Sequence, residues 1–263
     1  MRLDQALVQR KLCESRQEAQ EAIALGHVFV DGIPTTKQTK QITDEMTLTI
    51  SQRRKFVSRG GDKLEGALLH VFHTEDEARG ILANLEALDV GSSTGGFTDC
   101  LLSYGVTRVT AIDVGTSQLH NKLRADERVT VFENTDIRTF VSEKQFDIIV
   151  ADLSFIPLEK VLDAFFSCTN NNSILFLLIK PQFEVGKGNT KKGIVKDDEL
   201  VEEVLTKYKH LVEEKGLRAV SVFPCSIAGG DGNQEYFMYG RIRETEENKD
   251  TKTSTHEIRT IRL

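Results

Sequence analysis

Residues 87–99 read Ala-Leu-Asp-Val-Gly-Ser-Ser-Thr-Gly-Gly-Phe-Thr-Asp: a short apolar run, a turn of small residues and the start of a helix. Glycine lets the backbone approach a ligand closely, and the first N–H groups of a helix have no partner inside the helix. About twenty residues later a second apolar run, 109–112, ends in Asp113. A carboxylate at the end of the next strand suits the two hydroxyls of a ribose. The pattern predicts a site for a nucleoside-containing cofactor.

The glycine turn also indicates which cofactor it favours. Dinucleotide-binding turns carry glycine at their first, third and sixth positions, and here Ser93 occupies the third. A pyrophosphate needs the close approach that glycine permits there, so the turn disfavours NAD. S-adenosylmethionine has no phosphate and tolerates a small polar residue at that place. An ordinary tight turn between a strand and a helix is the alternative, and Asp113 weakens it.

Apolar runs alternate with helical patterns along the rest of the chain. Residues 147–150 and 174–179 are almost continuously apolar, as expected of parallel strands that are covered on both faces. The alternation predicts an α/β protein with a doubly wound, Rossmann-like sheet that binds ligands at the carboxyl ends of its strands. The predicted strands are 88–90, 109–112, 129–132, 146–151, 174–179, 219–223 and 235–242, and the clearest helices are 96–102, 117–125, 158–166 and 197–214.

The last two predicted strands are separated only by the glycine-rich residues 229–233, with no helix between them. A connection of this kind predicts that the seventh strand runs antiparallel to a mostly parallel sheet. Methyltransferases usually have such a strand, whereas Rossmann dehydrogenases usually lack it.

The first fifty residues have a different pattern. Ser15 and Glu18 form a capping box at the start of a helix, which Gly26 ends. Asp31-Gly32 predicts a hairpin turn after a strand at 27–30, and a later strand is expected at 47–50. We therefore expect a small α+β module at 1–50, a basic linker at 51–61, the α/β domain at 62–243 and a polar tail at 244–263.

Charge is distributed unevenly between these parts. Residues 1–60 carry 10 Lys and Arg against 7 Asp and Glu, whereas the rest of the chain carries 24 against 33. A basic front end attached to an acidic body suggests a polyanionic partner for the front end, and a solvated surface is the alternative.

The sequence does not indicate a metal-binding, disulfide-rich, secreted or membrane protein. The four cysteines are scattered and form no C-x-x-C pair, so neither a metal site nor a disulfide framework is indicated. The start of the chain lacks the apolar run of a signal peptide, and no segment approaches 18 apolar residues. We expect a cytoplasmic protein with no membrane partner.

Residues 1–50 resemble the S4 RNA-binding module, through Arg2-Leu3-Asp4, Ser15-Arg16-x-x-Ala19, Gly26-x-Val28-x-Val30-x-Gly32 and Lys37. The resemblance implies that Arg2, Arg16 and Lys37 lie on the face that meets RNA. Cations on such a face contact phosphates and give affinity without sequence information. Alternatively, Arg2 and Arg16 only form surface ion pairs.

Charged residues also stand where apolar strands of the α/β domain end. Asp136, Asp152 and Lys180 follow predicted strands, and Glu235 opens the last one. A charge at the end of a buried strand is costly to desolvate unless it is paired or used. One such residue is most often part of a structural ion pair, but four on the rim of one sheet, beside a cofactor turn, predict a catalytic site.

The arrangement resembles the FtsJ-like ribose 2′-O-methyltransferases, whose signature is a Lys-Asp-Lys-Glu tetrad. The matching segments are Ser58-Arg59-Gly60-Gly61-Asp62-Lys63-Leu64, Ala151-Asp152-Leu153-Ser154-Phe155, Ile179-Lys180-Pro181-Gln182-Phe183-Glu184 and Gly232-Asn233-Gln234-Glu235-Tyr236-Phe237. With an S4 module in front, the chain resembles the haemolysin A (TlyA) family. The resemblance implies S-adenosylmethionine as donor, and as substrate a cytidine ribose in ribosomal RNA of a ribosomal subunit.

The tetrad would work mainly by positioning, because the sulfonium methyl group is already activated. Lys180 would hold the 2′-hydroxyl and either accept its proton or only orient it. Asp152 and Glu235 would orient the attacking oxygen and the ammonium groups of Lys180 and Lys63.

The donor would bind along the glycine turn. Asp113 would accept hydrogen bonds from both ribose hydroxyls, and Asp136 from the adenine amino group. Asp89 would contact the methionine ammonium or only brace the turn. The turn residues expected around the methionine portion are Gly91, Ser93, Gly95 and Gly96.

Further basic residues are candidates for RNA contact. Arg59 belongs to the family motif, and Lys187 and Lys191 lie in a glycine- and lysine-rich segment, 186–193, that follows the Lys180 motif. This segment would clamp the RNA over the site; a solvated, flexible loop is the alternative.

Three other functions compete with ribose methylation. Asp152-Leu153-Ser154-Phe155 stands where base-methylating enzymes carry an Asp/Asn-Pro-Pro-aromatic motif, but both prolines are missing. A non-catalytic, RNA-binding ribosome-assembly factor is a second alternative. A pore-forming haemolysin is a third, and no amphipathic pore segment supports it.

Overall fold

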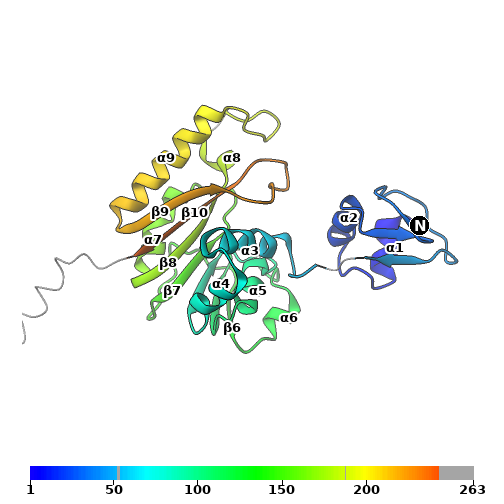
Figure 1. Cartoon of the computed structure of the whole chain (residues 1–263), viewed down its shortest axis with the longest axis horizontal. Helices are drawn as coiled ribbons and strands as arrows, with labels where there is room; N and C mark the ends of the chain where they lie inside the picture. The colour runs from blue at the N-terminus through cyan, green and yellow to red at the C-terminus, as the bar shows by residue number, and fades with distance from the viewer. Residues whose placement is uncertain (52–53, 187, 243–263) are drawn as a thin grey trace, which may run out of the picture. The chain divides into compact units, whose positions relative to one another are not determined.

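The computed structural model describes residues 1–51, 54–186 and 188–242, and the chain divides into two compact units, Met1–Ser58 and Arg59–Leu263 (Figure 1). The predicted tail at 244–263 and Lys187 lie outside the described residues. None of the described helices combines the length and the hydropathy that crossing a membrane would require.

The first unit is the predicted α+β module. Its elements are α1 (Leu3–Gln9), α2 (Arg16–Ala24), β1 (Val28–Val30), β2 (Ile33–Pro34) and β3 (Leu48–Ile50). The three strands form an antiparallel sheet in the order β2-β1-β3. Apolar side chains from both helices, including Leu3, Leu7 and Ile23, are fully buried in its core.

Local contacts explain where these elements begin and turn. The Ser15 hydroxyl accepts a hydrogen bond from the Glu18 N–H at 3.1 Å, as the capping box predicts. The Glu18 carboxylate accepts from the Glu14 N–H instead of the Ser15 N–H, so the box closes one residue earlier than usual. Asp31 and Gly32 have φ of 52° and 77°, the left-handed values that a two-residue hairpin turn requires.

The second unit is built on a seven-stranded sheet in the order β6-β5-β4-β7-β8-β10-β9. Pairings among β4 to β8 are parallel, and β10 is antiparallel to both β8 and β9, as predicted for the last strand. All seven predicted strands are present. The elements are α3 (Arg59–Phe72), α4 (Glu75–Leu82), β4 (Glu86–Val90), α5 (Gly96–Ser103), β5 (Arg108–Ile112), α6 (Asn121–Arg124), β6 (Val129–Phe132), β7 (Phe146–Ala151), η1 (Leu158–Lys160), α7 (Leu162–Ser167), β8 (Thr169–Ile179), α8 (Pro181–Glu184), α9 (Asp198–Glu214), β9 (Leu217–Pro224) and β10 (Tyr236–Ile242).

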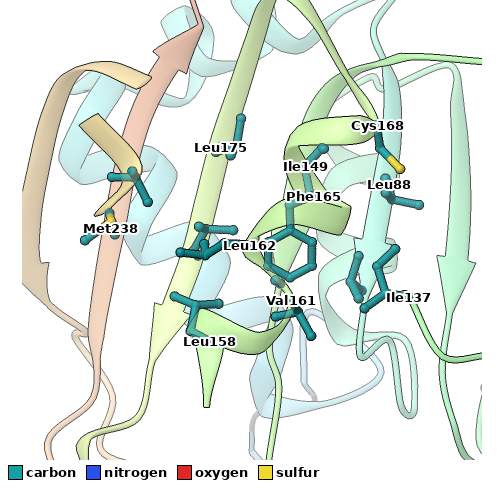
Figure 2. Close-up of a cluster of buried hydrophobic side chains, with 14 of the residues drawn as sticks. Leu88, Ile137, Ile149, Leu158, Val161, Leu162, Phe165, Cys168, Leu175 and Met238 are labelled. Atoms are coloured by element: carbon teal, nitrogen blue, oxygen red, sulfur yellow. The ribbon is translucent and has the colours of Figure 1, made fainter. Parts of the chain in front are cut away.

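Helices cover both faces of this sheet. Alternate residues of a strand point to opposite faces, and the two faces of β8 bury different partners. Leu175 and Leu177 belong to a cluster with side chains of η1, α7 and α9, part of which Figure 2 shows. Phe176 lies edge-on to Phe72 of α3, with ring centroids 6.0 Å apart. The sheet is therefore doubly wound, as predicted.

The helices depart from the prediction in three places. Of the helix expected at 117–125 only Asn121–Arg124 forms, and the one at 158–166 divides into η1 and α7. Helix α3 begins at Arg59, so the last three residues of the predicted linker are helical. Gly60-Gly61 indicates a linker on local propensity, but burial of Leu64 and Leu68 in the folded unit stabilises a helix that its glycines disfavour.

Candidate active site

The glycine turn follows β4 and contacts the ends of the neighbouring strands β5 and β7. Gly91 follows β4 with φ of 79°, and a Cβ at this position would lie 2.5 Å from the backbone oxygen of Asp152. Its N–H donates to the oxygen of Ile112, the last residue of β5, at 2.8 Å. Only glycine fits here, because both the backbone conformation and the space exclude a side chain.

The two later glycines of the turn, Gly95 and Gly96, lie at the start of α5. Gly95 is the N-cap of α5 with φ of 94°, and a Cβ there would clash with the side chains of Leu119 and Leu123. Gly96 is buried in the first turn of α5. Neither is among the residues that line the pocket described next, and their contact with the methionine portion stays a prediction. The absence of a Cβ at Gly95 lets the start of α5 pack against Leu119 and Leu123.

A pocket of about 360 Å³ opens at the carboxyl ends of β4, β5 and β7. Its lining includes four predicted donor-binding residues and one residue of the tetrad: Gly91, Ser93, Asp113, Asp136 and Asp152. The other lining residues are Val90, Ile112, Val114, Gln118, Thr135, Ile137, Leu153, Ser154, Phe155, Ile156 and Val161. Apolar walls with a few carboxylates are typical of a nucleoside site.

Backbone N–H groups hold the Asp113 carboxylate in place. Its two oxygens accept hydrogen bonds from Ser93 and Gly115, each at 2.7 Å. A carboxylate oxygen has two acceptor sites, so Asp113 retains capacity for a ligand. Asp136 pairs with the Arg138 guanidinium at 2.5 Å, and this hydrogen bond lowers the pKa of the carboxyl.

Asp89 is fully buried beneath the glycine turn and does not line the pocket. Its Oδ2 accepts a hydrogen bond from the Thr98 hydroxyl at 2.6 Å, whereas Oδ1 has no hydrogen-bond partner among the described residues. Burial raises the pKa of Asp89 to about 7. The contact with Thr98 of α5 favours the bracing role.

The residues of the tetrad form two ion pairs. Lys63, in the second turn of α3, has its Nζ 2.5 Å from Oε2 of Glu235, and both residues are buried. The Nζ of Lys180, directly after β8, lies 2.5 Å from Oδ1 of Asp152, directly after β7. It also donates to the Ser154 hydroxyl at 2.9 Å.

Strand register brings the two pairs to one edge. Tyr236 of β10 pairs with Ile179 of β8, so the adjacent residues Glu235 and Lys180 neighbour each other where β8 ends. The amino end of β10 lies at the carboxyl edge of the parallel strands because β10 is antiparallel. Asp152 connects this edge to the pocket, whose lining it shares.

Sequence reasoning missed an exposed aromatic side chain at this site. Phe155 is 90% exposed and has φ of 65°, which is unfavourable for a bulky residue. Its ring lies 4.9 Å from that of Phe183, between centroids, and both residues belong to segments that carry the tetrad. The sequence shows an aromatic residue three positions after Asp152, but no pattern indicates that its ring faces solvent.

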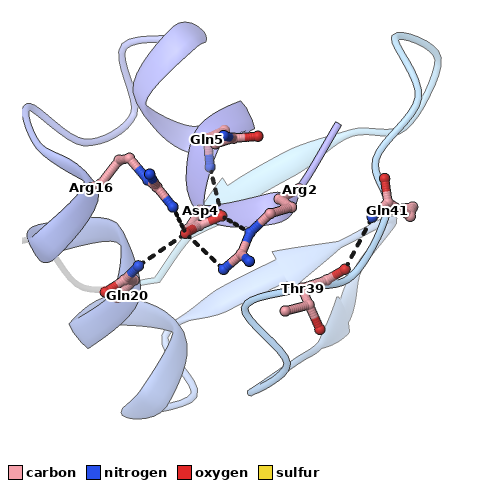
Figure 3. Close-up of polar contacts among 7 residues, drawn as sticks. All are labelled: Arg2, Asp4, Gln5, Arg16, Gln20, Thr39 and Gln41. Carbon is pink, nitrogen blue, oxygen red and sulfur yellow. Dashed lines mark hydrogen bonds and ion pairs between the residues drawn. The ribbon is translucent and has the colours of Figure 1, made fainter.

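In the first unit, Arg2 and Arg16 share one buried carboxylate (Figure 3). Asp4 accepts hydrogen bonds from both guanidinium groups and from Gln20, and the Arg2 hydrogen bond holds the pKa of Asp4 well below its usual range. The two arginine side chains remain 38% and 54% exposed. Ion pairing and RNA contact are thus compatible, since each guanidinium keeps donors that face solvent. Lys37 is exposed.

The remaining predicted RNA contacts differ in their surroundings. The Arg59 guanidinium donates to the backbone oxygen of Ala228 at 2.5 Å, so part of it is used within the second unit. Lys191 is exposed on a short turn.

A parallel sheet with one inserted antiparallel strand, a glycine turn after β4 and a carboxylate after β5 together define an α/β methyltransferase. Residues 56–242 match the family model of FtsJ-like methyltransferases, and residues 1–48 match that of the S4 domain.

Individual relatives agree with these models. Over 249 residues the chain is 41% identical to the 16S/23S rRNA (cytidine-2′-O)-methyltransferase TlyA of Mycobacterium tuberculosis, covering 92% of this chain and 90% of the relative. It is 39% identical over 245 residues to hemolysin A of Brachyspira hyodysenteriae, covering 91% and 99%. A solved Streptococcus thermophilus structure described as a hemolysin has a TM-score of 0.71 at 30% identity, covering 98% of each chain. The chain belongs to the FtsJ-like methyltransferases and, within them, to the family of TlyA and hemolysin A.

Proposed function

We propose that this protein transfers a methyl group from S-adenosylmethionine to the 2′-hydroxyl of a cytidine ribose in ribosomal RNA. The observation that carries the proposal is the pair of Lys–carboxylate contacts, Lys63–Glu235 and Lys180–Asp152, at the rim of a nucleoside-sized pocket that shares Asp152. A base-methylating enzyme has no need for the two lysines. The activity for which the Mycobacterium tuberculosis relative is named supports the same reaction.

The residues of the pocket fit S-adenosylmethionine. Asp113 would hold the ribose hydroxyls and Asp136 the adenine amino group, between the apolar side chains of Ile112 and Ile137. Gly91 lets the backbone of Asp152 approach the end of β4 closely at the wall of the pocket, which a Cβ would prevent. When bound, S-adenosylmethionine supplies a methyl group that its positively charged sulfur has already activated. The protein therefore has to position the nucleophile and to manage one proton.

Lys180 would do both. A charged ammonium has three donors, and Asp152 and Ser154 already lie within reach of two of them. The remaining donor would hold the 2′-oxygen and aim it at the methyl group. In the base role a neutral amine accepts the 2′-hydroxyl proton; in the orienting role the proton leaves to water.

Lys63 and Glu235 would fix the second side of this arrangement. The pair is nearly excluded from water, so neither side chain can turn away without leaving a buried charge uncompensated. Glu235 would thereby direct a carboxylate oxygen toward the Lys180 region from a rigid position.

The RNA would be held at several places. The exposed ring of Phe155 beside Phe183 suits stacking on an unpaired base, which is how proteins often hold single-stranded RNA. Lys191 in the segment after α8, and Arg2, Arg16 and Lys37 of the S4 unit, would contact phosphates, which gives affinity but no sequence information. The partner is ribosomal RNA within a ribosomal subunit.

The test is to incubate the purified protein with methyl-labelled S-adenosylmethionine and small or large ribosomal subunits whose RNA lacks the modification. Nuclease digestion and mass spectrometry then locate the label. We expect 2′-O-methylcytidine. A methyl group on a base would replace the proposal with base methylation, and donor binding without transfer to either subunit would support a non-catalytic assembly role.

A further inference from the structure

The lysine-rich segment after α8 contains a well-defined, hydrogen-bonded turn. The N–H of Lys191 donates to the oxygen of Ile194 at 2.9 Å, and the N–H of Ile194 donates back at 3.1 Å. The two central residues, Lys192 and Gly193, have φ of 54° and 81°. Reciprocal bonds around two left-handed residues define a two-residue hairpin turn of the type that strands use. This turn, residues 191–194, presents exposed Lys191 and Lys192 at its tip.

Asn233 fastens the turn to the segment that leads into β10. Its side-chain amide donates to the oxygen of Gly193 at 2.9 Å, and its side-chain oxygen accepts from the N–H of Val195 at 3.0 Å. The side chain thus pairs with the backbone as a neighbouring strand would. Asn233 is only 3% exposed, so both bonds are shielded from water and costly to leave unmade.

Asn233 also lies close in the chain to Glu235 of the tetrad. Its backbone oxygen accepts from the N–H of Gly229 at 2.9 Å, which closes the loop before β10, and Glu235 follows two residues later. The start of the lysine segment is held as well, since the Asn189 amide donates to the oxygen of Val185 at 2.6 Å. Within the described residues neither Lys191 nor Lys192 is in an ion pair, so both charges are available to a partner.

We propose that Asn233 is a positioning residue for RNA: its two hydrogen bonds hold the 191–194 turn so that Lys191 and Lys192 contact phosphates beside the target ribose. The inference rests on the proposed function, because it requires an RNA substrate at the Lys180 edge. Only a carboxamide offers both a donor and an acceptor at this place. An aspartate would turn a carboxylate oxygen toward the Gly193 oxygen, and an apolar residue would leave both backbone groups without partners.

The experiment measures the affinity of the full-length protein for ribosomal RNA at several salt concentrations. The variants are Asn233→Ala, the double variant Lys191→Ala/Lys192→Ala, and the triple variant that combines them. Loss of two phosphate contacts should weaken binding roughly 10-fold and reduce the slope of log affinity against log salt by about 1–2. We expect Asn233→Ala to produce a similar loss and a similar change of slope.

The decisive comparison is the triple variant. If Asn233 acts through the lysines, the triple variant binds no more weakly than the double variant, because groups that act as a unit are not additive. Additive losses would overturn the proposal, as would full RNA affinity in Asn233→Ala. Asn170→Ala is the matched control: it removes a carboxamide hydrogen bond, to Asp147, at the opposite end of the sheet. This control should leave both affinity and slope unchanged, and an equal loss there would also count against the proposal.

Folding and the proposed function are monitored separately. S-adenosylmethionine affinity should be unchanged in every variant that folds. If Asn233→Ala does not fold, Asn233→Asp is measured in its place. It keeps the acceptor for the Val195 N–H but loses the bond to Gly193, so it should weaken RNA binding by less than the double lysine variant does. Methyl transfer by the unaltered protein is measured in parallel, so an enzyme that binds RNA without methylating it would contradict the proposed function and leave the binding result to decide on Asn233.

Discussion

Lys63 and Glu235 are 172 positions apart in the chain, yet Nζ of one lies 2.5 Å from Oε2 of the other in a site from which water is nearly excluded. Lys63 comes from a helix that precedes the sheet in the chain, and Glu235 directly precedes the final strand. Removing one member of a buried pair leaves the other charge uncompensated, which costs more than the pair contributes.

Lys63→Met should therefore lower the free energy of unfolding by about 3 kcal/mol in urea denaturation. Lys63→Met/Glu235→Met should recover much of that loss, since an apolar pair of similar size leaves no buried charge. The matched control is Lys207→Met, which breaks the half-exposed pair with Glu159 and should cost about 1 kcal/mol or less. Equal losses in the two single variants would contradict the buried pairing.

Lys180→Met should reduce methyl transfer by about 10²-fold or more while S-adenosylmethionine affinity stays near that of the unaltered protein, because Lys180 does not line the pocket. Lys180→Arg should also fail, since a guanidinium remains charged and has a different shape. Single-turnover transfer rates and calorimetric donor binding check this. Turnover that survives in Lys180→Met would remove Lys180 from its assigned role.

The buried carboxyl of Asp89 predicts a pH effect of a definite sign. Burial raises its pKa to about 7 in the folded protein, above the ordinary value near 4, so the unfolded chain loses its proton first as pH rises. This group therefore destabilises the fold progressively between about pH 4 and pH 7. The stability of Asp89→Asn relative to the unaltered protein should rise across that interval and then level off.

The control for this titration is Asp126→Asn. Hydrogen bonding from Arg128 lowers the pKa of Asp126 to about 2, so its contribution is complete above about pH 4 and is lost only as pH falls. The stability difference for Asp126→Asn should stay flat from pH 5 to pH 8 in urea midpoints. A flat difference for Asp89→Asn as well would contradict a raised pKa.

Gly91→Ala should weaken S-adenosylmethionine binding at least 10-fold, because the added Cβ would force the Asp152 backbone away from the rim of the pocket. Gly80→Ala is the matched control: Gly80 lies in α4 with nothing within 4 Å of its added Cβ. There the substitution should leave donor affinity unchanged and raise stability by about 0.5–1 kcal/mol. Isothermal titration measures donor affinity and thermal melting measures stability for both variants. Equal donor affinity in Gly91→Ala and Gly80→Ala would contradict the prediction.

The sheet could be predicted because its signal is local. Buried parallel strands need continuous apolar runs, and 147–150 and 174–179 provide them. The reversal of β10 follows from a connection too short for a helix. Helix α3 could not be predicted in the same way, because Gly60-Gly61 disfavours a helix locally and burial of its apolar face in the folded unit stabilises it.

Some features of the site could likewise be predicted from the sequence, and others could not. The four tetrad positions come together as the motifs imply, whereas the roles given to Gly95 and Gly96 rest on a sequence pattern that does not distinguish ligand contact from helix packing. The exposure of Phe155 depends on where neighbouring loops leave the surface open, which no short pattern encodes. The roles assigned to individual site residues stay predictions.

The reversed direction of β10 has a consequence for biosynthesis. Glu235 lies 172 positions after Lys63 and is translated after the residues of the other six strands of the sheet. Until then Lys63 lacks the Glu235 carboxylate, and burying its ammonium group would cost desolvation energy without that compensation. A growing chain therefore contains every residue that lines the pocket before it contains Glu235, so the buried ion pair can form only near the end of synthesis.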